Sequence, residues 1–259
     1  MDLDFLANFA SNNEEKEELK YSKKDVLKLL KRIGVDTRFV SYFENDGEIE
    51  LYIENLRFSK FSKKRITTFN NYYPNIKVIR SSLFQKICHR VSKVLANELD
   101  PKSVILIPKI SDDYSKLMYI ILEPYSRKYG LKFIEFDESF DLDKFNEIDS
   151  VISPINLNQQ VNNILTDIFN GDGIIWDKKL NLSEYYGKKY SFESKKIVFP
   201  LINIPQEWIC DFLGLDINYE IDFYNEDIAS SFMGFLSDIN PQFKENVLAT
   251  SSFLELNQK

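Results

Sequence analysis

Three short polar segments each follow an apolar run in the second half of the chain, and they carry the side chains most suited to chemistry. They are Ser111–Ser115, Asp137–Glu138 and Ile155–Gln160. If the apolar runs are parallel strands, all three segments lie at the carboxyl edge of the sheet, where ligands bind in such folds. The carboxylates of Asp112 and Asp113 could face a phosphate only with a cation between them. They could equally cap the helix that follows, since acids suit a helix N-terminus.

A second group of side chains suits a polyanion. No Asp or Glu occurs between Glu54 and Glu98, and aromatic residues are interleaved with the basic ones. Cations release counterions from phosphates, and flat rings can stack on unpaired bases. A solvated surface with ordinary core aromatics is the alternative interpretation. The candidate RNA-binding residues are Arg57, Lys60, Lys63, Lys64, Arg65, Lys77, Arg80, Lys86, Arg90 and Lys93.

The elements that must position the basic group form a small N-terminal region. Residues 1–20 are predicted to form an acidic flexible tail, and residues 21–80 are predicted to form a small basic α+β region. Apolar spacing predicts a helix over residues 23–33 that stops at Gly34. An Asn-Asp-Gly turn within residues 37–56 predicts a β-hairpin. Basic helices are expected near residues 58–69 and from about 82 to 99.

The remaining chain, residues 81–259, alternates apolar runs with amphipathic segments. This alternation predicts an α/β domain with a doubly wound, mostly parallel sheet. The expected strands cover residues 103–108, 131–136 and 150–154. The expected helices cover residues 116–130, 141–148, 157–171 and 223–239, with another near the C-terminus.

Four stretches, in this order and spacing, resemble the PP-loop (adenine nucleotide α-hydrolase) superfamily, and within it the tRNA 2-thiolation proteins. They are VILIPKISDDYSKLMYIIL, FIEFDES, INLNQQVNNILTDIFNGD and FPLINIPQEWI, and the likeness spans about residues 82–256. The resemblance implies a PP-loop ATPase-like, Rossmann-like fold. It also implies a vestigial nucleotide site formed by Ser111, Asp112, Asp113, Ser115, Asp137 and Asn156.

The chain departs from that family where the chemistry would occur. A PP-loop needs glycines so that backbone N–H groups can wrap phosphates, and residues 110–115 contain none. Ile155 replaces the histidine of the family's second motif. Cys88 and Cys210 are the only cysteines, too few for the family's sulfur-carrying or cluster-binding pairs. These losses predict a pseudoenzyme with no catalytic residues, no metal and no cofactor.

Three functional hypotheses remain open. The first is a non-catalytic PP-loop paralogue that binds tRNA or acts as a scaffold in tRNA thiolation, beside a catalytic PP-loop subunit or another protein partner. The second is an active ATP-dependent, adenylating enzyme with a rewired loop that uses Mg²⁺. The third is a protein-interaction module without an RNA role. Steeply salt-dependent tRNA binding would count against the third.

Composition excludes several other classes. The 259 residues are 44% hydrophobic, enough for a packed core, and the formal net charge is −7. The chain contains no run of about 18 uncharged apolar residues, so no membrane-spanning helix is predicted. The acidic start does not resemble a signal peptide. Two cysteines exclude a disulfide framework, so a reduced, cytoplasmic setting is expected.

Overall fold

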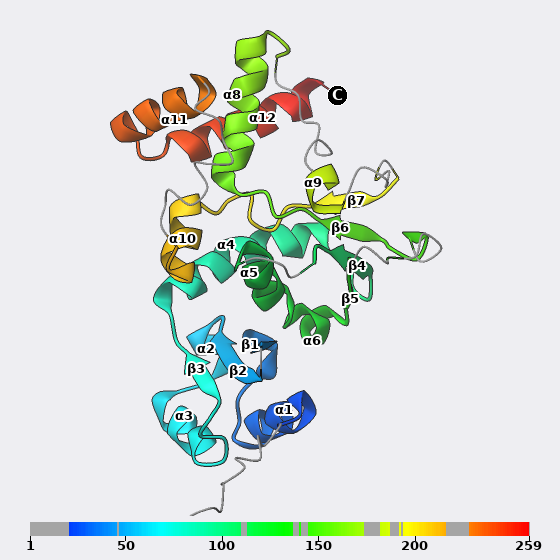
Figure 1. Cartoon of the computed structure of the whole chain (residues 1–259), viewed down its shortest axis with the longest axis vertical. Helices are drawn as coiled ribbons and strands as arrows, with labels where there is room; N and C mark the ends of the chain where they lie inside the picture. The colour runs from blue at the N-terminus through cyan, green and yellow to red at the C-terminus, as the bar shows by residue number, and fades with distance from the viewer. Residues whose placement is uncertain are drawn as a thin grey trace, which may run out of the picture.

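The computed structural model describes two β-sheets with helices around them. It covers residues 21–45, 47–109, 113–136, 140, 145–173, 182–186, 192, 194–215 and 228–258. In Figure 1 the blue and cyan N-terminal part lies at one end, the sheet of the green and yellow part in the middle, and the orange and red C-terminal helices at the other end. The acidic tail predicted at residues 1–20 lies outside the described residues.

The chain begins with the predicted helix and hairpin. Helix α1 (Lys23–Arg32) is capped by the Ser22 side chain, which accepts a hydrogen bond from the Asp25 backbone N–H. Strands β1 (Val40–Asn45) and β2 (Glu48–Ile53) pair antiparallel. Both predictions are confirmed. The hairpin is shorter than expected, because its first residues form the 3₁₀ turn η2 (Thr37–Phe39).

The basic helix predicted near residues 58–69 is split. Helix α2 (Leu56–Ser59) and helix α3 (Lys63–Asn70) are separated by Lys60, whose backbone is left-handed with φ 56°. The break turns Phe61 inward, where its side chain is fully buried. Strand β3 (Lys77–Ile79), which the sequence analysis did not predict, then pairs parallel to β2.

The parallel sheet confirms the predicted α/β, doubly wound class. It has the strand order β5-β4-β6-β7, and every neighbouring pair is parallel. Along β4, Ile105 and Ile107 pack into one hydrophobic cluster while Leu106 packs into another. Alternate residues thus bury both faces of the sheet. The strands are β4 (Val104–Ile107), β5 (Lys132–Glu135), β6 (Ser150–Ile152) and β7 (Lys196–Val198).

Helices cover the two faces unequally. The cluster on one face includes buried residues of α4 (Ser82–Glu98), α5 (Asp113–Leu122) and α10 (Gln206–Leu213). The opposite face is covered by α9 (Leu182–Tyr186), whose Tyr186 ring is fully buried. Burial on both faces explains why the strands read as apolar runs in the sequence.

The single helix predicted over residues 116–130 is wrong. Helix α5 ends at Leu122, and a short helix α6 (Tyr125–Tyr129) follows Pro124. Proline has no backbone N–H to continue the helical hydrogen bonds, so the break falls there. Residues 141–144 of the helix predicted at residues 141–148 lie outside the described residues.

Three helices form the C-terminal end of the molecule. Helix α8 (Leu157–Asn170) ends at Gly171 with φ 83°, as the sequence predicted. One hydrophobic cluster joins α8 to α11 (Ile228–Ile239) and α12 (Phe243–Gln258). It contains Leu157 and Val161 of α8, Ala229 of α11 and Leu248 of α12. Figure 1 shows α11 and α12 beside α8 at the top. None of the described helices combines the length and apolarity that a bilayer crossing requires.

A buried ion cluster joins the N-terminal part to the α/β domain. Glu123 accepts hydrogen bonds from Arg127 Nη2 at 2.8 Å and from the Tyr42 backbone N–H at 3.0 Å. Arg127 also donates to the backbone carbonyls of Thr37 at 3.1 Å and Val40 at 2.7 Å. One guanidinium therefore ties α6 to η2 and β1.

A second pair lies in the same cluster. Lys128 bonds to Glu54, whose side chain is 5% exposed and whose other carboxylate oxygen, Oε1, has no hydrogen-bond partner among the described residues. Burial raises the pKa of Glu54 to about 7, against the opposing effect of Lys128. In Glu123 the balance is reversed. Burial acts upward there too, but the hydrogen bonds from Arg127 hold the pKa of Glu123 below its usual value.

Candidate functional site

Strand order places the expected ligand crevice between β4 and β6. The chain leaves β4 for β5 on one side and then crosses to β6 on the other, which makes the carboxyl ends of β4 and β6 the topological switch point. Ser153 and Asn156 follow β6 directly, and both are fully buried. Of the predicted nucleotide-site residues, Ser111, Asp112 and Asp137 lie outside the described residues.

Asn156 is the N-cap of α8. Its Oδ1 accepts from the Gln159 backbone N–H at 3.0 Å, and Gln159 Oε1 accepts from the Asn156 backbone N–H at 2.8 Å, which completes a capping box. Within the described residues, Asn156 Nδ2 and Ser153 Oγ have no hydrogen-bond partner. The switch point therefore holds two buried polar atoms that nothing described satisfies.

The other predicted residues occupy the start of α5. Asp113 is exposed in its first turn, where a carboxylate suits the helix dipole. Ser115 is buried at 8% exposure.

The described residues at this edge include no phosphate-binding loop. Ile155 is buried where the resembling family has histidine, and Asp113 carries a negative charge. No glycine stands in residues 108–115 to let the backbone approach a phosphate.

Metal and sulfur chemistry also lack a donor set in the part of the chain that is described. No group of three or more His, Cys, Asp or Glu side chains gathers there. Cys88 on α4 and Cys210 on α10 are both buried, and burial raises the pKa of the Cys88 thiol. His89, next to Cys88, is exposed, so the two side chains diverge along α4 as expected for helical neighbours.

Glu207, which matches the resembling family's Pro-Glu segment, serves a structural role. Lys244 Nζ on α12 lies 2.5 Å from its carboxylate, and Asn158 Nδ2 on α8 lies at 3.5 Å. Burial would raise the pKa of Glu207, but the Lys244 hydrogen bond lowers it below the usual value. Asn158 Oδ1 also accepts from the Gln206 backbone N–H at 3.1 Å. These contacts hold α8, α10 and α12 together.

The predicted RNA-binding residues divide into engaged and unengaged cations. Arg90 donates to the Asn203 carbonyl at 2.8 Å and lies over the Trp208 ring at 4.3 Å, while Lys77 pairs with Glu50 at 3.1 Å. Arg65 donates to the Lys60 carbonyl at 2.6 Å. The others are exposed and form no ion pair within the described residues. We call them the exposed basic set: Arg57, Lys60, Lys63, Lys64, Arg80, Lys86 and Lys93.

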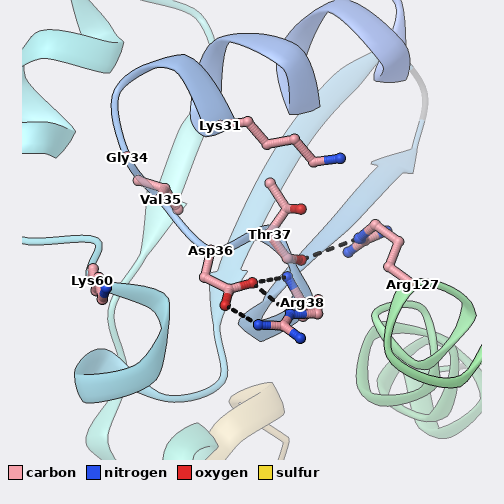
Figure 2. Close-up of a pocket in the computed structure, with 8 residues that line it drawn as sticks. All are labelled: Lys31, Gly34, Val35, Asp36, Thr37, Arg38, Lys60 and Arg127. Carbon is pink, nitrogen blue, oxygen red and sulfur yellow. Dashed lines mark hydrogen bonds and ion pairs between the residues drawn. The ribbon is translucent and has the colours of Figure 1, made fainter.

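A basic groove adjoins this set at Lys60. It has a volume of about 620 Å³ and lies between the end of α1, the η2 turn and α6 (Figure 2). Among its lining residues, Lys60 is the one that the sequence analysis names as an RNA-binding candidate. Arg127 lies 90 residues from Thr37 in the chain, so no local pattern could have joined them. The lining residues are Lys31, Gly34, Val35, Asp36, Thr37, Arg38, Lys60 and Arg127.

Comparison with known proteins adds a similarity to a solved structure. No family model matches the chain, and no curated protein matches it. Among solved structures, the chain is similar to the U34-tRNA thiolase NcsA from Methanococcus maripaludis with its 4Fe-4S cluster. The identity is 11%, the match covers 71% of this chain and 82% of that chain, and the TM-score is 0.42. A superposition this loose carries no argument about function.

Proposed function

We propose that the chain is a non-catalytic RNA-binding subunit with a PP-loop-like fold, and that its RNA is tRNA. The observation that carries the proposal is the exposed basic set, whose cations have no carboxylate partner within the described residues. Unpaired surface cations keep their full charge for an external polyanion, whereas paired cations are already neutralised.

Exposed aromatic rings lie among these cations. Phe58 is 52% exposed and Tyr72 is 60% exposed, although residues of this size are usually buried. Phe58 stands on α2 beside Arg57, whose guanidinium is 6.0 Å from the ring centroid. Rings of this kind can stack on unpaired bases such as those of tRNA loops. Charge and stacking together favour RNA over a simple acidic protein.

The non-catalytic and tRNA parts of the proposal depend on other observations. The described switch-point residues lack a phosphate cradle, a metal-ligand group and a sulfur-carrying cysteine pair. The sequence resemblance to tRNA 2-thiolation proteins supplies tRNA as the class of RNA and thiolation as the setting. It also supplies a catalytic PP-loop subunit as the expected partner.

A scaffold role would explain the surface of α11. Ile228, Phe232, Phe235 and Ile239 are 39–76% exposed and recur at intervals of four, three and four residues along the helix. This spacing puts them on one side of a helix, as in helix–helix interfaces. An apolar stripe of this kind suits a protein partner.

The test is binding of the full chain to an unmodified tRNA transcript across a range of salt concentrations. We expect log K to fall linearly with log salt, and Lys63→Glu/Lys64→Glu to weaken binding at least about tenfold. The matched control is Lys109→Glu/Lys132→Glu, which reverses two exposed lysines of the α/β domain and should leave affinity within about threefold. Absent tRNA binding, or equal losses in both variants, would contradict the proposal.

A second candidate function is nucleotide binding at the switch point, which the unsatisfied Ser153 Oγ and Asn156 Nδ2 favour. Calorimetric titration with ATP–Mg²⁺ tests it directly. No heat up to millimolar ligand supports the non-catalytic proposal. Micromolar binding that Ser115→Ala abolishes would reverse the ranking and make adenylation the reaction to assay.

A further inference from the structure

The basic groove is a concave site whose cations come from four separate segments. Lys31 stands in the last turn of α1, Arg38 in η2, Lys60 after α2 and Arg127 on α6. Asp36 is the one carboxylate among the lining residues. In Figure 2 the Lys31 side chain extends above Thr37 toward Arg127, while Arg38 folds back on Asp36. The lining residues therefore carry a net positive charge.

The internal pairing of the groove leaves donors for a ligand. Arg38 Nε and Nη2 bind the two Asp36 oxygens at 3.0 and 2.7 Å, and this hydrogen bond holds the pKa of Asp36 below its usual value. Arg38 Nη1 makes no hydrogen bond to any described residue. The side-chain ammonium groups of Lys31 and Lys60 make neither a hydrogen bond nor an ion pair to any described residue, although the charge of Lys60 helps to lower the pKa of Asp36. A guanidinium held at one edge and free at the other is oriented in advance for phosphate.

The backbone of Lys60 provides an independent observation. Its φ of 56° and ψ of 20° lie in the left-handed region, where glycine or asparagine is normal and lysine costs about 1 kcal/mol. This turn is fixed by two bonds: Ser59 O accepts from the Asp36 backbone N–H at 2.8 Å, and Lys60 O accepts from Arg65 Nη1 at 2.6 Å. The backbone of Lys60 is therefore held in one conformation at the rim of the groove.

We infer that this groove binds backbone phosphates of the RNA, with Lys31 and Lys60 as the contacting cations and Arg38 Nη1 as a further hydrogen-bond donor. The inference rests on the proposed function and extends its RNA surface from the exposed basic set across η2 to α6. Arg127 positions the groove, because its guanidinium is already bound to Glu123 and to two carbonyls. The ligand chemistry is a phosphodiester, and small free phosphates are the alternative source that the test must separate.

The experiment compares tRNA binding by the full chain with that of Lys31→Gln/Lys60→Asn. Asparagine tolerates the left-handed backbone, so folding should be retained, and thermal unfolding checks it. Lys24→Gln/Lys28→Gln is the matched control, because it removes the same charge from exposed residues of α1 outside the groove. We expect the groove variant to bind about tenfold more weakly, with the salt slope reduced by about 2, and the control to change less than about threefold.

The outcomes separate this inference from the proposed function. Wild-type chain that does not bind tRNA overturns both. A second outcome overturns only the inference about the groove: the wild-type chain binds tRNA, Lys63→Glu/Lys64→Glu weakens the binding, and the groove and control variants both change it by the same small amount. Pyrophosphate at constant ionic strength is the remaining arm: if it stabilises the wild-type chain but not the groove variant, and does not displace tRNA, the groove is a small-anion site and the inference is wrong.

Discussion

Basic side chains around the N-terminal sheet occupy two contrasting environments. At the ion cluster, Arg127 and Lys128 are only 17% and 13% exposed, and each bonds to a buried carboxylate. On α3, Lys63 and Lys64 are exposed and face no carboxylate within the described residues. The first kind of cation stabilises the fold, and removing its carboxylate partner leaves a buried charge unpaired. The second kind contributes little to folding and is available for a ligand.

The largest expected effect is a loss of stability when a carboxylate of the buried ion cluster is removed. Glu123→Ala should lower the free energy of unfolding by about 3–5 kcal/mol, because Arg127 would keep its charge in a buried site without its carboxylate. Urea unfolding monitored by circular dichroism measures it. Lys63→Ala, on the exposed side, should change stability by no more than about 0.5 kcal/mol. Similar losses in the two variants would remove the distinction.

The next effect is a pH dependence that arises from Glu54. Its pKa is raised to about 7, whereas the unfolded chain releases this proton near pH 4.5. The folded state therefore binds more protons between these values, and the Glu54 contribution to stability falls as pH rises through that window, by about 2–3 kcal/mol. The neighbouring charges that act on it are Lys128, Glu123 and Arg127.

Glu54→Gln should abolish this fall, which unfolding measured at several pH values from about 5 to 8 would detect. Glu123 does not obscure the window. Its pKa is lowered, so its contribution is complete above the unfolded pKa and is lost only on further acidification. A variant whose stability still fell as the wild type's does would show that Glu54 is ionised in the folded protein at pH 5.

A smaller effect concerns the switch point. Ser153→Ala removes a buried hydroxyl that has no partner within the described residues, so stability should stay the same or rise by about 1 kcal/mol. Binding of tRNA should not change. Chemical unfolding and the tRNA titration check both expectations. A destabilised variant that had also lost ATP binding would mean that Ser153 serves a ligand site.

The smallest effect separates stability from binding at one position. Lys60→Gly should raise the free energy of unfolding by about 0.5–1 kcal/mol, because glycine adopts the left-handed backbone without strain. The same change should weaken tRNA binding about threefold, because one phosphate contact is lost. Lys63→Gly is the contrasting variant, since glycine on helix α3 costs stability. A Lys60→Gly chain that bound tRNA normally would place Lys60 outside the RNA surface.

The sequence predicted those parts of the fold that depend on local pattern. Apolar runs identified β4, β5 and β6 because both faces of each strand are buried. Strand β3 was missed because it has only three residues and because its pairing partners in β2 lie far back in the chain, as in the pair Glu50 and Lys77. The break at Lys60 was missed because lysine carries no signal for a left-handed backbone. Tertiary contacts at Phe61 impose it.

The candidate sites were predictable in proportion to their locality. The exposed basic set was visible as a stretch without acids. The groove was not, because Arg127 reaches it from α6, 90 residues beyond Thr37 in the chain, and Lys31 belongs to a helix that was predicted from its apolar spacing. Nor could the sequence separate Arg90, which binds Asn203, from unengaged neighbours. Whether a charge has a partner is a property of the folded chain.

Arg127 has a mechanical consequence. With hydrogen bonds to the Thr37 and Val40 carbonyls and to Glu123, its guanidinium links η2 and β1 to α6 and opposes hinge motion between them. A pull on the groove would be transmitted through α6 to the strands. An RNA bound there would keep a constant orientation toward the carboxyl edge of β4 and β6. The folded protein would then fix the distance between the bound RNA backbone and a base placed at that edge.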